Sequence, residues 1–407
     1  MKILVLNCGS SSVKFQLIET DLDRIDRNED LVLARGLVEK IGSHEAVITC
    51  EAGARTVHDV GLELLDHRSA IDKVLAALKG TGAMADLKEI QAVGHRVVHG
   101  GDFRGSQLIT PDVLKRIEDA VELAPLHNPH NLRGYYACAQ LFPDRPQVAV
   151  FDTAFHQTMP PRAYLYGLPF DYYRRHRIRR YGFHGTSHRY VAFRFRQLTN
   201  RSREDTNLIS CHLGNGCSIT AIQFGRSVDT SMGFTPLEGL MMGTRPGDLD
   251  PAILLHLMAK QEMGINEMST LLNRHSGLLG VSGETNDMRT LLESARQGHE
   301  RARQAIDIFC YRLRKYIGAY SAVLGTVHGL IFTAGIGENA PPIRELACGD
   351  LKSLGYELDA EKNNRAVGVE AEISTAASKA RIYVIPTNEE LPIARDTFRL
   401  IEGVQQD

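Results

Sequence analysis

Apolar residues near the N-terminus fall in two short runs, at 3–7 and 13–19, on either side of a small polar turn rich in glycine and serine. This pattern predicts two β-strands joined by a tight turn. The same layout returns in 207–225, where a turn of glycine and asparagine separates two further apolar runs. The repeat, about half a chain away, predicts a duplicated domain in which each half carries one phosphate-gripping hairpin.

Helical spacing of apolar residues is clearest over 301–324, which predicts a long helix with one buried face. A second helix is predicted over 62–79. A third is predicted from Thr110, because Pro111 suits the first helical position and Pro125 suits the end.

Further strands are predicted from short apolar segments. Residues 147–155 read as a buried strand that ends on an aspartate, and 329–340 as a strand, a glycine turn and a helix start. The segment 381–391 predicts a strand followed by a helix, which Thr387 and Glu390 would begin as a capping box. Strands that alternate with helices favour an α/β architecture.

Composition excludes several classes of protein. A length of 407 residues favours two or three domains, and a formal net charge of −2 gives no overall attraction to nucleic acid or to an anionic membrane. The seven scattered cysteines show no zinc spacing and are expected to be reduced thiols in a cytoplasm. The apolar run at the N-terminus is too short for a secretion signal, and none elsewhere is long enough to span a membrane. The basic run 174–181 lacks an accompanying aromatic platform and is interpreted as a solvated face.

The glycine-rich turns are the first candidates for binding chemistry. Glycine lets the backbone approach an anion closely, so that successive N–H groups can surround a phosphate. Lys14 follows the first turn, and Gly335 with Gly337 marks a strand-to-helix turn against which a nucleotide could lie. Each turn alone is equally an ordinary turn, and no P-loop or complete dinucleotide fingerprint is present.

Histidines and arginines beside glycines form the second candidate. His99, His184 and His188 lie within three residues of a glycine, and Arg245 stands between two glycines, where its planar fork could reach a phosphoryl group. No spacing typical of a zinc site accompanies them. As a set with His127 and Arg96 they indicate an anion site, although any single histidine is as well explained by packing or helix capping. Asp152, at a strand end, suits a catalytic carboxylate, whereas Glu389 and Glu390 could simply be first-turn carboxylates.

Ten motifs taken together resemble the acetokinase family. They are LNCGSSSVKF, GHRVVHGG, APLHNP, VAVFDTAFHQTMP, YGFHGTSHRYV, HLGNGCSI, DTSMGFTPLEGLMMGTRPGDLDP, SGLLGVSGETND, AGIGENA and IPTNEELPIAR, and they span nearly the whole chain in that order. Propionate and butyrate kinases share much of the pattern.

The resemblance implies a fold and a reaction. The fold is that of two duplicated ribonuclease H-like α/β domains of the sugar kinase, heat-shock ATPase and actin superfamily, with a cleft between them. Residues 1–152 with 388–407 would form the N-terminal domain, and 153–387 the nucleotide-binding domain, which would also carry a homodimer interface. The reaction is reversible transfer of the γ-phosphoryl group of ATP to acetate, giving acetyl phosphate and ADP, with Mg²⁺ or alternatively Mn²⁺.

The resemblance also implies roles for individual residues. The catalytic residues would be Asp152, His184 and Arg245. Acetate would be bound by Arg96, which would hold its carboxylate, and by Val98, Leu126, His127, Phe183 and Pro236. The nucleotide would be bound by Lys14, His212, Leu213, Gly214, Asn215, Gly216, Asp287, Met288, Arg289, Gly335, Ile336, Gly337, Glu338 and Asn339. The magnesium side would be Asn7 and Glu389.

The chemistry of a carboxylate acceptor agrees with these roles. Acetate is already ionised at neutral pH, since its pKa is about 4, and it needs no base to become a nucleophile. The barrier is the approach of an anion to a polyanion, so positive charge and positioning should supply most of the catalysis. Asp152 is therefore expected to act through magnesium and its waters rather than as a proton acceptor.

Two alternative functions stay open from the sequence alone, and one residue departs from the family pattern. The rival within the family is a propionate kinase, because one methylene is worth only about 1–3 kcal/mol of discrimination. The rival of another class is a nucleotide-gated binding protein of the actin or heat-shock type, which would leave the histidine and arginine set unexplained. Ala334 stands where the resemblance expects glycine, a difference expected to matter little.

Overall fold

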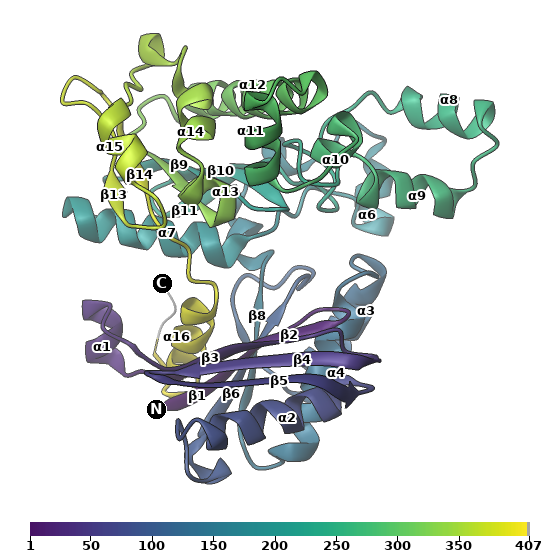
Figure 1. The fold of residues 1–407 in the computed structure, drawn as a ribbon, viewed down its shortest axis with the longest axis vertical. Helices are drawn as coiled ribbons and strands as arrows, with labels where there is room; N and C mark the ends of the chain where they lie inside the picture. The colour runs from purple at the N-terminus through teal and green to yellow at the C-terminus, as the bar shows by residue number, and fades with distance from the viewer. Residues whose placement is uncertain (405–407) are drawn as a thin grey trace. The chain divides into compact units, whose positions relative to one another are not determined.

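The computed structural model describes residues 1–404 and divides into two compact units (Figure 1). The first unit contains residues 1–157 together with the chain from Asn388 onward, and the second contains 158–387. The chain therefore leaves the first unit, builds all of the second, and returns to the first to finish it.

The first unit is built on a mixed sheet with the strand order β5-β4-β3-β2-β1-β6-β8-β7. The first five strands are antiparallel neighbours, and β1, β6 and β8 run parallel. The strands are β1 Lys2–Cys8, β2 Ser12–Glu19, β3 Leu31–Glu39, β4 Ser43–Ala52, β5 Arg55–Leu64, β6 Ala92–Val97, β7 Gln107–Leu108 and β8 Gln147–Phe151.

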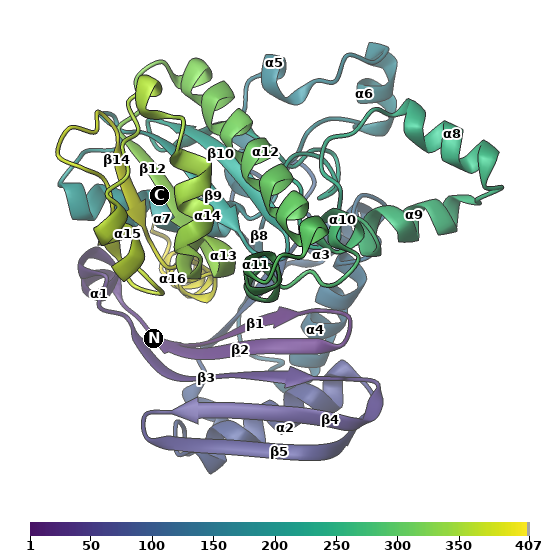
Figure 2. The ribbon, with the colours of Figure 1, turned by 45° about the horizontal axis from the view of Figure 1, so that its top comes forward.

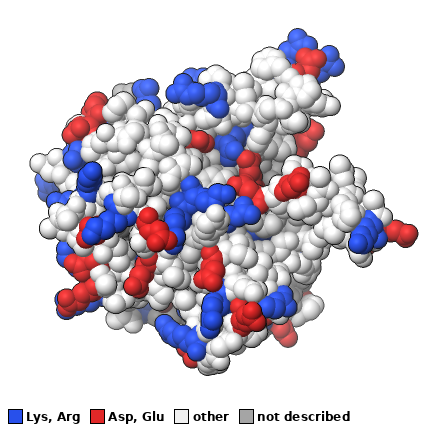
Figure 3. Space-filling model, turned by 90° about the horizontal axis from the view of Figure 1, so that it is seen from above, with Lys and Arg blue, Asp and Glu red and all other residues white. Residues whose placement is uncertain are grey.

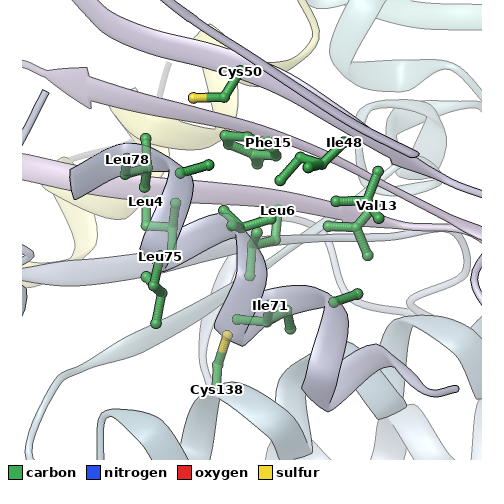
Figure 4. Packing of buried hydrophobic residues seen from close by; sticks show 14 of the residues in the cluster. Leu4, Leu6, Val13, Phe15, Ile48, Cys50, Ile71, Leu75, Leu78 and Cys138 are labelled. Carbon is green, nitrogen blue, oxygen red and sulfur yellow. The ribbon is translucent and has the colours of Figure 1, made fainter. Parts of the chain in front are cut away.

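Helices cover both faces of this sheet. They are α1 Leu22–Arg27, α2 His67–Gly80, α3 Pro111–Asp119, α4 Asn128–Leu141 and α16 Glu390–Ile401. Figure 4 shows Ile71, Leu75 and Leu78 of α2 packed against Leu4 and Leu6 of β1. The opposite face is covered by α16, where a side chain at Gly94 of β6 would meet atoms of α16 at less than 3 Å. Burial of each such leucine or isoleucine is worth about 1.5–3 kcal/mol.

The second unit repeats this sheet topology. Its strand order is β11-β10-β9-β12-β14-β13, with β9, β10 and β11 antiparallel and β9, β12 and β14 parallel. The core order β11-β10-β9-β12-β14 matches β3-β2-β1-β6-β8 of the first unit strand for strand. The predicted duplication within an α/β fold is thereby confirmed. The strands are β9 Asn207–Leu213, β10 Cys217–Gln223, β11 Arg226–Thr230, β12 Gly329–Thr333, β13 Ala371–Glu372 and β14 Arg381–Val384.

The second unit is richer in helices, as Figure 2 shows. The long helix predicted over 301–324 is confirmed as α12, which packs on β9 and β10, while α7 packs on β9 and β12. The helices are α5 Pro161–Tyr164, α6 Phe170–His176, α7 Gly185–Thr199, α8 Ala252–Lys260, α9 Ile265–Arg274, α10 Gly277–Ser282, α11 Met288–Arg296, α12 Glu300–Leu324, α13 Ala334–Asn339, α14 Pro341–Cys348 and α15 Ala360–Arg365.

Two local predictions were wrong at helix starts. The helix predicted over 62–79 begins only at His67, because Asp66 caps it by accepting a hydrogen bond from Ser69 N at 2.8 Å, and the residues up to Leu64 belong to β5. The capping box of Thr387 and Glu390 does not form.

The first turn of α16 is held in another way. The side chain of Asn388 accepts from Leu391 N at 3.0 Å, and Glu390 is the first residue of the helix. Thr387 uses its hydroxyl with Ser187 and its N–H with Glu338, so neither group is directed at the helix.

Candidate functional site

The residues that the sequence singles out are divided between the two units. The first unit contains Asn7, Lys14, Arg96, Val98, Leu126, His127, Asp152 and Glu389. The second contains Phe183, His184, His212–Gly216, Pro236, Arg245, Asp287–Arg289 and Gly335–Asn339.

An arginine–aspartate pair forms the centre of the group in the first unit. Arg96 lies near the end of β6, and Asp152 directly follows the adjacent parallel strand β8, so the two side chains meet at one sheet edge. Arg96 donates from Nε to Oδ1 of Asp152 at 3.0 Å and from Nη2 to Oδ2 at 2.6 Å. Such a two-bond fork is geometrically specific and strong.

Burial and the opposite charge of the partner act in opposite directions on the pKa values of Arg96 and Asp152. Burial raises the pKa of the Asp152 carboxyl, and the Arg96 guanidinium opposes that rise. Burial lowers the pKa of Arg96, but Asp152 and Glu389 together outweigh it and hold that pKa above its ordinary value. Nη1 of Arg96 lies 3.9 Å from Oε2 of Glu389, on the edge of the fork away from Asp152. That edge retains donors suited to a carboxylate ligand.

Two backbone carbonyl groups of the first hairpin turn are held by side chains from α2 and α4. Gly9 N donates to Ser12 O at 2.8 Å, which closes the turn. A ring nitrogen of His67 lies 2.7 Å from Gly9 O, and Asn131 donates to Cys8 O at 2.8 Å. Neither His67 nor Asn131 could be found from the sequence, because each acts across a long stretch of chain.

The residues that follow β6 are hydrogen-bonded to asparagine side chains at the start of α4. Val98 N donates to Asn131 Oδ1, and His99 N donates to Asn128 Oδ1, each at 3.0 Å. Val98 is half-buried, whereas Leu126 is 55% exposed. His127 is the residue that precedes α4.

Glu389 and Glu390, which lie where the chain re-enters the first unit, contact different partners. Lys14 pairs with Glu390, whose Oε1 lies 2.7 Å from Nζ, and Asn7 lies opposite Lys14 in the β1–β2 register. Glu389 is instead on the Arg96 side. The two neighbouring carboxylates therefore differ in their contacts: Glu390 pairs with Lys14, and Glu389 lies near Arg96.

In the second unit, the hairpin turn meets an arginine and a histidine. A Cβ added at Gly216 would lie 2.6 Å from Nη2 of Arg245 and 3.6 Å from Nε2 of His184, so both side chains approach the bare face of this glycine. Arg245 is anchored by donation from Nη1 to Pro236 O at 2.7 Å, and burial lowers its pKa. The turn itself is tied down by donation from Gly243 N to Asn215 O at 2.9 Å.

His184 occupies an unusual backbone position and belongs to a histidine cluster. Its φ is +57°, in the left-handed region, at the entry to α7. Its ring stacks on that of His212 with centroids 4.0 Å apart. Its Nδ1 lies 2.9 Å from Ser218 Oγ, and His188 Nε2 lies 2.7 Å from the same hydroxyl. The sequence pointed to the histidines but not to Ser218.

The strand-to-helix segment after β12 is a continuous helix start rather than an open glycine turn. Ala334 has a φ of +64°, and α13 begins there. The side chain of Glu338 accepts from Thr387 N at 3.0 Å. Arg344, which is fully buried, donates to the carbonyls of Gly337 and Glu338 and so holds the end of α13 in place. Glycine adopts this conformation without the cost that alanine has, so the structure favours glycine at 334.

Asp287 and Arg289 bond chiefly to one another. Asp287 caps α11 and accepts from Arg289 N at 2.9 Å, and the Arg289 guanidinium donates to the same carboxylate at 2.8 Å. These hydrogen bonds lower the pKa of Asp287. Met288 between them is buried.

Within residues 1–404, no three histidine, cysteine, aspartate or glutamate side chains gather closely enough to hold a metal by themselves. Asn7, Asp152 and Glu389 supply only oxygen donors. Such a set fits Mg²⁺, which is usually held by one or two carboxylates and otherwise by water and phosphate oxygens.

The basic run 174–181 divides into two parts. Arg174 and Arg175 lie on the surface of α6 near Asp171, whereas Arg179 stacks on Tyr164 with its guanidinium carbon 3.7 Å from the ring centroid. Figure 3 shows basic and acidic side chains interspersed over one face of the molecule. Among the described residues, no helix is long and apolar enough to cross a membrane.

Comparison with known proteins identifies the family. The model of the acetokinase family matches residues 2–395. The chain belongs to the acetokinase family.

Relatives of acetokinase type match over the full length. An acetate kinase of Thermoanaerobacterium thermosaccharolyticum is 52% identical over 409 residues, covering 100% of both chains, and one of Solibacter usitatus is 54% identical over 410 residues, covering 99% of each. The crystal structure of Porphyromonas gingivalis acetate kinase matches with a TM-score of 0.92 and 44% identity, covering 98% of this chain and 99% of that one. A propionate kinase structure from Francisella tularensis matches with a TM-score of 0.90 and 42% identity, covering 99% and 100%.

This acetokinase is accordingly a phosphotransferase with a carboxyl group as acceptor, and its activity is that of an acetate kinase. The alternative of a nucleotide-gated binding protein without an acceptor is thereby set aside.

Proposed function

We propose that the chain transfers the γ-phosphoryl group of ATP to a carboxylate oxygen of acetate. The new bond joins that oxygen to the γ-phosphorus, and the bond from the γ-phosphorus to the β–γ bridging oxygen breaks. Acetyl phosphate and ADP are the products, and the reaction runs in both directions. No proton has to move, because acetate is already an anion.

The observation that carries this proposal is the state of Asp152. Both of its oxygens accept hydrogen bonds from Arg96, and Asp152 is almost fully buried. A carboxylate held in this way is poorly placed to remove a proton from a substrate hydroxyl. It suits an acceptor that needs no base, and the edge of Arg96 away from Asp152, which faces Glu389, carries donors that suit the acetate carboxylate.

Positive charge for the transferring phosphoryl group would come from the second unit. Arg245 and His184 approach the same glycine of the 214–216 turn, and Arg245 is anchored at Pro236 O. A well-placed cation of this kind is worth about 10³-fold or more in rate. Arg245→Ala should lower kcat far more than it raises KM. Equal effects on both constants would contradict the assignment.

In the second unit, the nucleotide phosphates would lie against the 214–216 turn and 335–339 would lie near the nucleoside; in the first unit, Lys14 is proposed to contribute to nucleotide binding. Asn7, Asp152 and Glu389 would hold Mg²⁺, directly or through water. When bound, the ion would neutralise charge on the phosphates. Replacing Glu389 with Gln should therefore raise the Mg²⁺ concentration needed for half-maximal rate, while Glu390→Gln should not, because Glu390 is paired with Lys14.

Acetate is proposed as the preferred acid over propionate, with Val98 limiting the space for the methyl group. The test is acyl phosphate formation, trapped as the hydroxamate, with formate, acetate, propionate and butyrate. We expect the highest kcat/KM with acetate and a value about 10–200-fold lower with propionate. A higher value with propionate would make the chain a propionate kinase.

A homodimer formed through the second unit is also proposed. Helices α8 and α9 expose large apolar side chains, with Leu255 72% and Ile265 79% exposed, and no residue of α8 is buried. Exposed apolar area of this kind is typical of subunit interfaces. Sedimentation velocity should show a dimer that Leu255→Lys weakens. A monomer at micromolar concentration would refute the proposal.

A further inference from the structure

A ladder of two serines and one histidine extends from His184 into the second sheet. His184 Nδ1 lies 2.9 Å from Ser218 Oγ, and this hydroxyl lies 2.7 Å from His188 Nε2. At the far end, His188 Nδ1 lies 2.9 Å from Ser210 Oγ. His188 and both serines are fully buried, so water does not compete for these contacts.

The hydrogen-bonding capacity of these groups leaves two states for a neutral His184, which differ in whether Ser218 donates to Nδ1 or accepts from it. A serine hydroxyl donates one proton, and a neutral imidazole donates from one nitrogen and accepts at the other. If Ser218 donates to His184, then His188 must donate to Ser218 from Nε2, and Ser210 must donate to His188 Nδ1. In the other state His184 donates to Ser218, so the proton of His184 lies on Nδ1.

Only one direction suits the approach of His184 to the hairpin turn. Its Nε2 faces the same side of Gly216 as the Arg245 guanidinium. Phosphoryl oxygens are hydrogen-bond acceptors, so a useful neutral imidazole there must carry its proton on Nε2. That tautomer leaves Nδ1 as an acceptor, which requires Ser218 to donate to it.

We infer that Ser218, His188 and Ser210 are positioning residues that hold the His184 proton on Nε2, facing the transferring phosphoryl group. This inference rests on the proposed role of His184. A nucleophilic role for Ser218 does not fit, because its hydroxyl lies between two imidazoles with no exposed surface. Loss of the correct tautomer is known from hydrolytic triads to cost up to about 10⁴-fold in kcat.

The direct test is nitrogen-15 NMR of the full-length protein with labelled histidine, with the His184 signals assigned by their loss in His184→Gln. The inference expects Nε2 to be protonated and Nδ1 to be a bare acceptor at pH 7.5. A proton on Nδ1, or on both nitrogens, would overturn it. This readout needs no substrate.

Kinetics of a matched pair tests the direction of the ladder. His188→Gln keeps an N–H that can donate to Ser218, whereas His188→Leu has none. We expect kcat within about fivefold of the natural chain for Gln and a loss of about 10²-fold or more for Leu, each with KM within about threefold. Equal kcat values for the two variants would overturn the inference.

Two further variants complete the design. Thr220→Val removes another buried hydroxyl of the same strand, which lies 2.8 Å from Thr230 Oγ1 and touches no histidine of the ladder, and it should leave kcat unchanged. His184→Gln tests the proposed role itself. If that variant keeps full kcat, the role of His184 in phosphoryl transfer is wrong, while the tautomer measured by NMR still decides the ladder.

Discussion

A single methyl group added at Gly216, as in Gly216→Ala, should impair catalysis without impairing folding. An alanine Cβ there would lie 2.6 Å from Nη2 of Arg245, whereas ordinary contact begins at 3.4 Å. The guanidinium must therefore retreat by about 0.8 Å. The backbone φ of Gly216 is not in the left-handed region, so alanine introduces no strain of its own.

The expected cost follows from this displacement. A misplacement of about 1 Å in a catalytic group costs about 10²-fold, equivalent to about 2.7 kcal/mol of transition-state stabilisation. The melting temperature should fall little, because the atom displaced is the end of an arginine side chain and not the backbone. The assay is hydroxamate trapping of acetyl phosphate at saturating acetate, combined with thermal unfolding.

A double-mutant cycle with Arg245→Ala makes this prediction sharp. If the methyl group acts only through the guanidinium, Gly216→Ala should cost nothing further once Arg245 is replaced. Gly167→Ala is the matched control, since a Cβ there meets no atom within 4 Å. An undiminished kcat for Gly216→Ala, or an undiminished loss in the Arg245→Ala background, would refute the reasoning.

Three other predictions concern stability and specificity. Burial lowers the pKa of His95 to about 4, so the unfolded chain binds more protons between pH 6.5 and 4; stability should fall by about 3 kcal/mol over that range, and His95→Gln should lose this slope in denaturant titrations. Ala334→Gly should raise the free energy of unfolding by about 1 kcal/mol, because φ is +64°; an unchanged midpoint in urea would contradict this. Val98→Ala should raise the propionate-to-acetate ratio of kcat/KM by about tenfold, measured by hydroxamate formation, and an unchanged ratio would remove Val98 from the acid pocket.

Local patterns in the sequence predicted the elements that local physics decides. The two hairpins and α12 follow from alternation and helical spacing, and Pro111 marked the start of α3 correctly. The start of α2 was misplaced because apolar residues of β5 also match helical spacing, and the cap at Asp66 was overlooked.

The residues that hold the site residues in place could not be predicted from the sequence. His67 reaches the carbonyl of Gly9, and Ser218 lies between two histidines, only because strands and helices distant in sequence pack together. Glu389 and Glu390 are neighbours with the same side chain, yet only the tertiary fold directs one to Lys14 and the other to Arg96.

The position of α16 at the end of the chain has a consequence for synthesis. Its residues 390–399 are buried against the first sheet, and Arg395 forms an ion pair of 2.5 Å with Asp30. During synthesis, one face of the first sheet stays uncovered until residues 158–387 have been made, because α16 follows them in the chain. A prematurely released chain would lack both this cover and Glu389, so nascent fragments should be aggregation-prone, and the proposed magnesium site would be completed last.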